Sequence, residues 1–231
     1  MLTLAIEATN PNVPTPGVLL AEGERILARG DLERGGRHDD LLLPLVARLL
    51  HDQGVGPAQL ERIVVSIGPG GFTASRLACV AAAMLGELSG AQLLTVPTAW
   101  VAFASTLGPE GLGRPAVVAM ATKGEQAFVC RSEPGSATRD EGRSVAADAF
   151  AGLAAVGEVL IHEGHLPPAF EASAQEKGLQ RAPMRLTPEG LLACLPLAEE
   201  VAPEALRPIY PREPDAVTQW RRRHGRAPGD A

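Results

Sequence analysis

Aromatic residues are scarce in this 231-residue sequence, at 3% of the chain, whereas hydrophobic residues make up 45%. The core must therefore be built from alanine, leucine and valine, which pack helices closely but provide few rings on which bases can stack. The formal net charge of -6 repels phosphate backbones, so contact with RNA would need a local basic patch. These shortages weigh against single-stranded nucleic-acid binding as the main function.

Cysteine and long apolar runs are also in short supply. Cys79, Cys130 and Cys194 are far apart and lack C-x-x-C spacing, so they indicate neither a disulfide framework nor a zinc site. No basic segment followed by an apolar stretch opens the sequence, and no apolar run approaches the ~18 residues that cross a bilayer. We therefore expect a cytoplasmic protein without a membrane segment.

A cluster of basic residues lies near the C-terminus, in the run Arg221-Arg222-Arg223-His224-Gly225-Arg226. Pro228 and Gly229 follow it, and such a stretch cannot form much packed structure. We expect residues 216–231 to be a flexible basic tail. A solvated tail is favoured over an arm that contacts RNA, and the sequence leaves both open.

Short apolar runs alternate with helical spacings in an order typical of α/β proteins. In the first half these patterns predict strands at 2–6, 17–21, 25–29, 62–67 and 91–96, and helices at 39–52, 72–88 and 98–107. The second half repeats the order more weakly, with strands at 116–121, 127–131 and 158–162, and helices at 145–155, 170–177 and 188–200. The order predicts two α/β lobes, each with a mixed sheet flanked by helices, at 1–107 and 108–215. The length alone also allows a single domain.

A glycine-rich motif stands between a predicted strand and a predicted helix: Gly68-Pro69-Gly70-Gly71-Phe72-Thr73-Ala74-Ser75-Arg76. Glycines there permit positive φ and a close approach of backbones, and the start of the helix attracts anions. The spacing matches neither G-x-x-x-x-G-K-[ST] nor G-x-G-x-x-G, because Thr73 stands where the latter needs its last glycine. The segment therefore fails as a nucleotide-binding motif.

The same segment resembles the G-P-G-S-F-T-G-x-R motif of the TsaB (YeaZ) family. Further stretches are similar in order and spacing: Ile6-Glu7-Ala8-Thr9, His38-Asp39-Asp40-Leu41-Leu42-Leu43-Pro44, and Pro208-Ile209-Tyr210-Pro211-Arg212. The residues that carry the family motif are Gly68, Pro69, Gly70, Phe72, Thr73, Arg76, Pro208, Tyr210 and Arg212. The resemblance runs from Leu2 to about Arg212 and is strongest over the first hundred residues.

This resemblance implies an actin-like/RNase H-like (ASKHA) fold that has lost catalysis and serves as a scaffold. Members of the family pair with the catalytic subunit TsaD, and an ATPase, TsaE, joins them. Together they transfer a threonylcarbamoyl group to the adenosine beside the anticodon of tRNA. The resemblance further implies a homodimer in isolation, indirect contact with tRNA, and no cofactor or metal of the chain's own, since ATP and a metal ion belong to the partner subunits.

The family pairs through the first two helices of its first lobe, here about 39–52 and 72–88. The expected interface residues are His38, Leu42, Leu45, Leu49, Phe72, Ala74, Arg76, Ala78, Val80, Ala81, Ala82 and Leu85. Two apolar stripes run along the second of these helices. One stripe contains Leu77, Val80, Ala81, Met84 and Leu88, and the other contains Ala74, Ala78, Ala82 and Leu85. The small alanines would let a partner helix approach closely, but the pattern allows equally that both stripes are buried within the chain.

Two other functions stay open beside the scaffold. An actin-like enzyme would use Glu7 and the Gly68–Gly71 turn, although prolines at 11, 14 and 16 remove backbone donors that phosphate needs. The family's D-A-R-x-x-E-V-Y stretch appears here as 120–127 without its first acid, which favours a divergent member or a self-associating paralogue. His162, Glu163 and His165 do not match H-E-x-x-H, and the H-x-x-x-H metal pair of TsaD is absent, so no metal site is expected.

Overall fold

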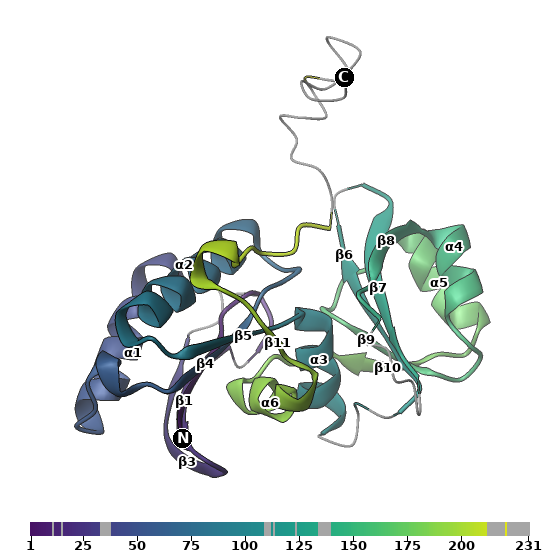
Figure 1. The fold of residues 1–231 in the computed structure, drawn as a ribbon. Coiled ribbons are helices and arrows are strands. Elements are labelled where there is room, and N and C mark those ends of the chain that lie inside the picture. Colours follow the sequence, from purple (N-terminus) through teal and green to yellow (C-terminus); the bar gives the residue numbers. More distant parts are fainter. Residues whose placement is uncertain are drawn as a thin grey trace.

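The computed structural model describes residues 1–10, 12–14, 16–32, 38–108, 112, 114–122, 124–133, 140–211 and 220, and for 38–40 it describes the backbone only. Two sheets organise this part of the chain, and they stand side by side with helices between and around them (Figure 1). None of the described helices combines the length and the apolar character needed to cross a membrane.

The first sheet has six strands in the order β11-β5-β4-β1-β2-β3. β1 pairs in parallel with β4, which pairs in parallel with β5, while the remaining pairs are antiparallel. The bounds are β1 (Leu2–Glu7), β2 (Gly17–Glu22), β3 (Arg25–Asp31), β4 (Arg62–Ser66), β5 (Gln92–Val96) and β11 (Glu199–Glu200). Leu4, Ala5 and Ile6 of β1 are 0% exposed, as expected for a central strand covered on both faces.

The second sheet has five strands in the order β10-β9-β6-β7-β8, and it is also mixed. Its strands are β6 (Ala116–Ala121), β7 (Gln126–Ser132), β8 (Arg143–Ala146), β9 (Val159–His162) and β10 (Gln180–Pro183). The described helices are α1 (His38–Asp52), α2 (Phe72–Ser89), α3 (Thr98–Leu107), α4 (Ala147–Leu153), α5 (Pro168–Glu176) and α6 (Pro188–Ala193), with short 3-10 turns η1 (Pro57–Gln59), η3 (Leu195–Leu197) and η4 (Pro203–Ala205).

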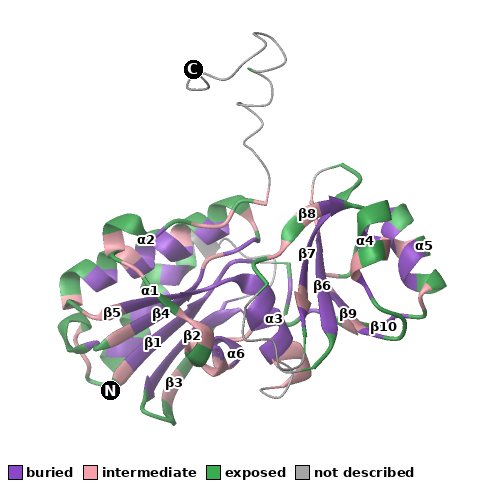
Figure 2. Cartoon of the chain, turned by 45° about the vertical axis from the view of Figure 1, so that its right-hand side comes forward, coloured by how far each residue is buried: buried purple, intermediate pink, exposed green. Residues whose placement is uncertain are grey.

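The helices form three layers around the two sheets. α1 and α2 cover the outer face of the first sheet, α4 and α5 cover the outer face of the second, and α3 and α6 lie between the sheets (Figure 2). The middle layer is almost wholly buried, with Phe103 0% and Trp100 5% exposed. Its core joins Val64 of the first sheet to Val118 of the second, so the two lobes share one hydrophobic cluster.

The predicted class and most predicted elements are confirmed: an α/β chain with two mixed sheets. Two local predictions are wrong. The helix expected at 145–155 begins only at Ala147, because the preceding residues form β8, where Val145 pairs with Ala127 of β7. The helix expected at 188–200 ends at Ala193, since Pro196 cannot continue it. The short strands β8, β10 and β11 were not predicted.

The expected lobe boundary also needs correction. α6 packs against β1, β2 and β4 of the first sheet, and β11 extends that sheet beside β5. We call residues 198–211 the return segment, because they run back along the first lobe. The main-chain N–H of Val201 donates to the carbonyl of Leu93 at 3.0 Å. Residues 188–210 therefore belong with the first lobe rather than with 108–215. Except for Trp220, the expected tail at 216–231 lies outside the described residues.

Candidate functional site

The glycine motif forms a tight turn between β4 and α2. Gly68 has a φ of +96°, which side-chain-bearing residues rarely adopt. A Cβ on Gly70 would lie 2.4 Å from the carbonyl oxygen of Thr9, so only glycine fits there. The N–H of Gly71 donates to the same oxygen at 2.8 Å. The motif therefore fastens the start of α2 to the chain that leaves β1.

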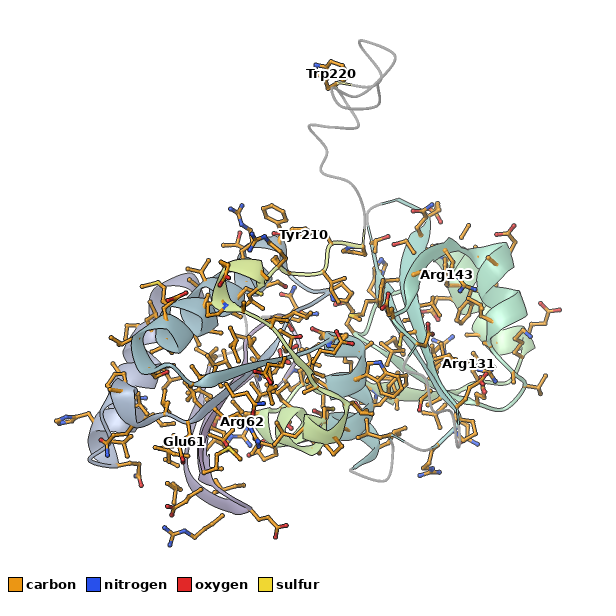
Figure 3. The ribbon with its side chains drawn as sticks, viewed as in Figure 1. Glu61, Arg62, Arg131, Arg143, Tyr210 and Trp220 are labelled. Atoms are coloured by element: carbon orange, nitrogen blue, oxygen red, sulfur yellow. The ribbon has the colours of Figure 1, made fainter. Side chains whose placement is uncertain are left out.

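The two halves of the family motif, far apart in the sequence, meet at this turn. The N–H of Ile209 donates to the carbonyl of Ile67 at 2.7 Å. The rings of Phe72 and Tyr210 have centroids 5.1 Å apart, and the guanidinium carbon of Arg76 lies 5.3 Å from the Phe72 centroid. Tyr210 is labelled in Figure 3 where the return segment meets the start of α2. Arg212 lies outside the described residues.

Most of the expected interface residues are buried inside the chain. Their side chains are at most 9% exposed: Leu42, Leu45, Leu49, Ala74, Ala78, Ala81, Ala82 and Leu85. All but Ala74 belong to the cluster between the first sheet and helices α1 and α2. The alanine stripe thus faces its own sheet, where small side chains allow close packing, and its assignment to a docking surface is wrong. The side chain of His38 is outside the described residues.

The solvent side of α2 carries four large exposed apolar residues. Phe72, Val80, Met84 and Leu88 are 56%, 54%, 59% and 64% exposed. Val80, Met84 and Leu88 recur every four residues and so lie along one face, and Phe72 stands at the first position of the helix. We call these residues the α2 face. Phe72 and Val80 were among the expected interface residues, whereas Met84 and Leu88 were not, because the sequence does not say which of the two stripes faces the sheet.

Beside the α2 face lies a groove of about 730 Å³ between α2 and the return segment. Its lining residues are Phe72, Arg76, Cys79, Val80, Ala83, Met84, Pro203, Leu206, Arg207, Pro208 and Tyr210. We call this the α2 groove. The sequence does not predict this groove, because its two walls come from segments more than a hundred residues apart in the chain.

A buried carboxylate lies under the glycine turn, where an actin-like enzyme would place its catalytic acid. Glu7 is 0% exposed, and its Oε1 accepts from the N–H of Thr9 at 3.0 Å and from the Thr9 hydroxyl at 2.7 Å. The Thr98 hydroxyl donates to that of Thr9 and is 2.8 Å from Oγ of Ser66. Oε2 of Glu7 is buried without a hydrogen bond. Glu7 is thus enclosed and cannot reach a ligand in the space between the lobes.

The histidines considered as metal ligands are not brought together with other ligands. Nδ1 of His162 accepts from the N–H of Gly164 at 3.2 Å, and Glu163 accepts from the side-chain amide of Asn10 at 2.8 Å. Within the part of the chain that the structure describes, no group of three or more His, Cys, Asp or Glu side chains is arranged to hold a metal ion. Cys79, Cys130 and Cys194 are buried, and they form no disulfide with one another.

We expect Glu7→Gln to make the free energy of unfolding less dependent on pH. Burial raises the pKa of Glu7 above 4.5, against the lowering effect of its hydrogen bonds from Thr9. A carboxyl whose pKa is raised by folding favours the protonated form in the folded state, so the wild type gains stability as pH falls through that raised pKa toward 4.5. Glutamine keeps an acceptor for Thr9 and carries no charge.

Urea unfolding between pH 7.5 and about 4.5 tests this expectation. The wild type should become more stable toward the acidic end relative to the variant, and Glu7→Gln should be at least as stable as the wild type at neutral pH. Glu176→Gln, at an exposed position on α5, is the control for removing one charge. An unchanged pH slope in the Glu7 variant would show that the buried group carries no excess cost of ionisation.

Comparison with known proteins places this arrangement in a family. Residues 34–192 match the family model described as TsaD: tRNA N6-adenosine threonylcarbamoyltransferase. The chain belongs to the TsaD family. Uncharacterized proteins of Mycobacterium tuberculosis strain H37Rv and Mycobacterium bovis are each 30% identical to it over 214 residues, which cover 92% of both chains.

Solved structures share the fold of this chain. YeaZ from Pseudomonas aeruginosa superposes with a TM-score of 0.66, at 19% identity, over 90% of this chain and 99% of that one. A second structure, an uncharacterized protein from Pseudomonas aeruginosa with similarity to peptidase YEAZ, gives a TM-score of 0.69, also at 19% identity, over 91% and 99%. The resemblance to TsaB (YeaZ) is therefore confirmed, and with it the actin-like two-lobe fold.

Proposed function

We propose that this chain is a non-catalytic scaffold subunit that binds a TsaD-like catalytic subunit, with a TsaE-like ATPase, for threonylcarbamoyl transfer to the adenosine beside the anticodon of tRNA. The observation that carries the proposal is the α2 face, a row of large apolar side chains that the chain itself leaves more than half exposed. Contiguous exposed apolar surface of this kind marks interaction sites in soluble proteins.

The two sides of α2 support a role in docking. Ala78, Ala81 and Ala82 hold the helix against its own sheet, so the side chains on the other side are free to meet a second surface without weakening the core. A helix that is apolar on both sides needs two apolar neighbours. We propose that the partner subunit supplies the second, and that in its absence another copy of this chain covers the same face.

The enclosure of Glu7 supports the absence of chemistry on this chain. A metal-dependent phosphoryl transfer needs a carboxylate that reaches the ion, whereas Glu7 is fully buried and hydrogen-bonded to Thr9. The protein then needs no cofactor of its own, and ATP and the metal ion act in the partner subunits. Such a subunit works in the cytoplasm and meets tRNA indirectly, through the complex.

We expect Met84→Asp to abolish most of the affinity for the cognate TsaD-like subunit. Burying an unpaired carboxylate in an apolar interface typically costs a few kcal/mol, and roughly 2.8 kcal/mol corresponds to 100-fold weaker binding. Calorimetric titration of the two purified subunits measures the dissociation constant. Ile26→Asp is the matched control, since Ile26 is 50% exposed on β3, away from α2. Equal affinity of the Met84 variant and the wild type would exclude the α2 face as the docking surface.

A further inference from the structure

The middle layer of helices joins the two lobes firmly. The chain passes from the first lobe to the second after α3 and returns before α6. The N–H of Thr187, just before α6, donates to Oγ of Ser105 in α3 at 3.0 Å. The indole N–H of Trp100 donates to the carbonyl of Asp140 in the second lobe at 3.0 Å. Because α3 and α6 also lie in the shared hydrophobic cluster, the lobes cannot separate along this layer without exposing their common core.

Beyond the start of α3 the lobes face each other across open pockets rather than a packed core. A pocket of about 220 Å³ lies between Asn10 of the first lobe and Met120 and Glu163 of the second. Another, of about 480 Å³, separates the return segment at 209–211 from residues 141–144 of the second lobe. Side chains that do not touch across a gap gain no dispersion contact there, so the lobes are held on this side mainly by the hydrogen bonds that cross it.

Two hydrogen bonds cross between the rims of these pockets. Nδ2 of Asn10 donates to Oε2 of Glu163 at 2.8 Å, although the two residues are 153 positions apart. The hydroxyl of Ser144 donates to the carbonyl of Pro211 at 2.6 Å. Pro211 is tied to the first lobe, because the N–H of Ile209 bonds to the end of β4. Figure 1 shows the return segment passing from beside α2 to the strands of the second sheet.

We propose that the Asn10–Glu163 and Ser144–Pro211 hydrogen bonds form a releasable latch between the lobes, with the middle layer as its pivot. A single hydrogen bond changes the ratio of two states by about tenfold, whereas opening the shared core costs a large part of the stability of a domain. Release of the latch therefore opens the gap between the lobes and leaves the rest of the fold intact. The second lobe then has a role of its own, because it holds the end of the return segment in place.

A purely local role for Asn10 is the simplest alternative to a latch. Its Oδ1 accepts from the N–H of Asn12 at 3.0 Å and so shapes the turn that follows β1. That bond uses the oxygen of the side-chain amide, whereas the bond to Glu163 uses its nitrogen. Asn10→Asp separates the two roles. An oxygen remains for Asn12, and a second oxygen replaces the donor and meets the carboxylate of Glu163, which repels it.

The reactivity of a thiol introduced into the gap measures how often the gap opens. Met120 is 4% exposed and lines the smaller pocket, so a bulky thiol reagent reaches the side chain of Met120→Cys only when the lobes part. In this background we expect Asn10→Asp to raise the labelling rate at least tenfold. Glu163→Gln alone should have little effect, because its oxygen still accepts from Asn10. Combined with Asn10→Asp it should restore the slow rate, because the new amide donates to the new carboxylate.

Ser144→Ala tests the second bond in the same background, with Ser144→Thr as the matched control that keeps a hydroxyl. We expect about tenfold faster labelling in the alanine variant and little change in the threonine variant. Cys194 is 0% exposed in the shared core, so its labelling reports unfolding of the pivot. Peptide mass spectrometry distinguishes it from the introduced thiol, and its rate should stay unchanged in every variant.

Three results would overturn the inference. Unchanged labelling in both Asn10→Asp and Ser144→Ala would show that the gap does not depend on these bonds. Faster labelling that Glu163→Gln does not reverse would confine the role of Asn10 to its own turn. A parallel rise at Cys194 would mean that the whole fold loosens rather than the gap alone. None of these measurements involves a partner, so the proposed docking function stands or falls separately.

Discussion

Gly70→Ala is expected to destabilise the protein by roughly 2–4 kcal/mol, because the added Cβ would overpack the turn and break a buried hydrogen bond. That Cβ would lie 2.4 Å from the Thr9 carbonyl oxygen and 2.9 Å from its carbon, and Thr9 is itself fully buried. The turn must move away, and the hydrogen bond from Gly71 to Thr9 is then lost. Chemical denaturation followed by circular dichroism measures the loss.

A substitution at the neighbouring Gly71 should instead stabilise the protein. Gly71 is the N-cap of α2, with φ −64° and ψ 129°, and it offers no side chain to the free N–H groups of the first turn. Gly71→Ser supplies a hydroxyl at a backbone conformation that serine adopts readily, so we expect a gain of a few tenths of a kcal/mol. The TsaB motif carries serine at this place. Equal effects of the two substitutions would mean that the contact with Thr9 does not constrain the turn.

The sequence predicts the tight turn at Gly68–Gly71 but not the contact that this turn makes with Thr9. Glycines between a strand and a helix indicate a tight connection, and the spacing of Gly68 to Arg76 identified the TsaB resemblance. The contact with Thr9 depends on how β1 and β4 pair, in register Ile6 to Val65, which is a long-range property. The motif indicates that glycine is needed at this position. Only the tertiary structure shows that the Thr9 carbonyl oxygen leaves no room for a side chain at Gly70.

The helix α2 illustrates the same limit. Periodicity places Ala78 and Val80 on different stripes of α2, and that prediction is confirmed, since one is 0% and the other 54% exposed. Periodicity does not say which stripe meets the sheet. Close packing on the sheet selects the alanines, and the larger side chains are left outside. The alanines predicted to lie at the interface are therefore buried against the sheet, and Val80 is on the side of α2 that faces solvent.

The return segment could not be assigned from sequence for a related reason. Its strand β11 has two residues, Glu199 and Glu200, and neither is typical of strands. It forms because the backbone pairs with Thr95 and Leu94 of β5, and because Pro196 ends the helical stretch before it. Local preference favoured a longer helix, and the pairing with an available sheet edge outweighs it.

Phe103→Ala should produce a large loss of stability, about 3–5 kcal/mol, because it opens a cavity where both lobes meet. Phe103 is 0% exposed on α3, in a cluster that contains residues of both sheets. A domain of this size is stable by about 5–15 kcal/mol, so the variant should lose a substantial fraction of its stability. Thermal unfolding monitored by calorimetry measures the change.

Phe150→Ala is the control variant, because it opens a cavity in a core that belongs to the second sheet alone. Phe150 is also 0% exposed, but it lies in the cluster under α4 and α5 on the far side of the second sheet, against Phe170. Phe150→Ala should cause a similar loss of stability. The folded fraction of this variant should still bind the partner, because neither α2 nor the return segment packs on that cluster. Phe103→Ala removes contacts beneath α6 and the first sheet, so it should weaken partner binding as well. If both variants bound the partner like the wild type, the shared core would hold the lobes together without positioning the docking surface.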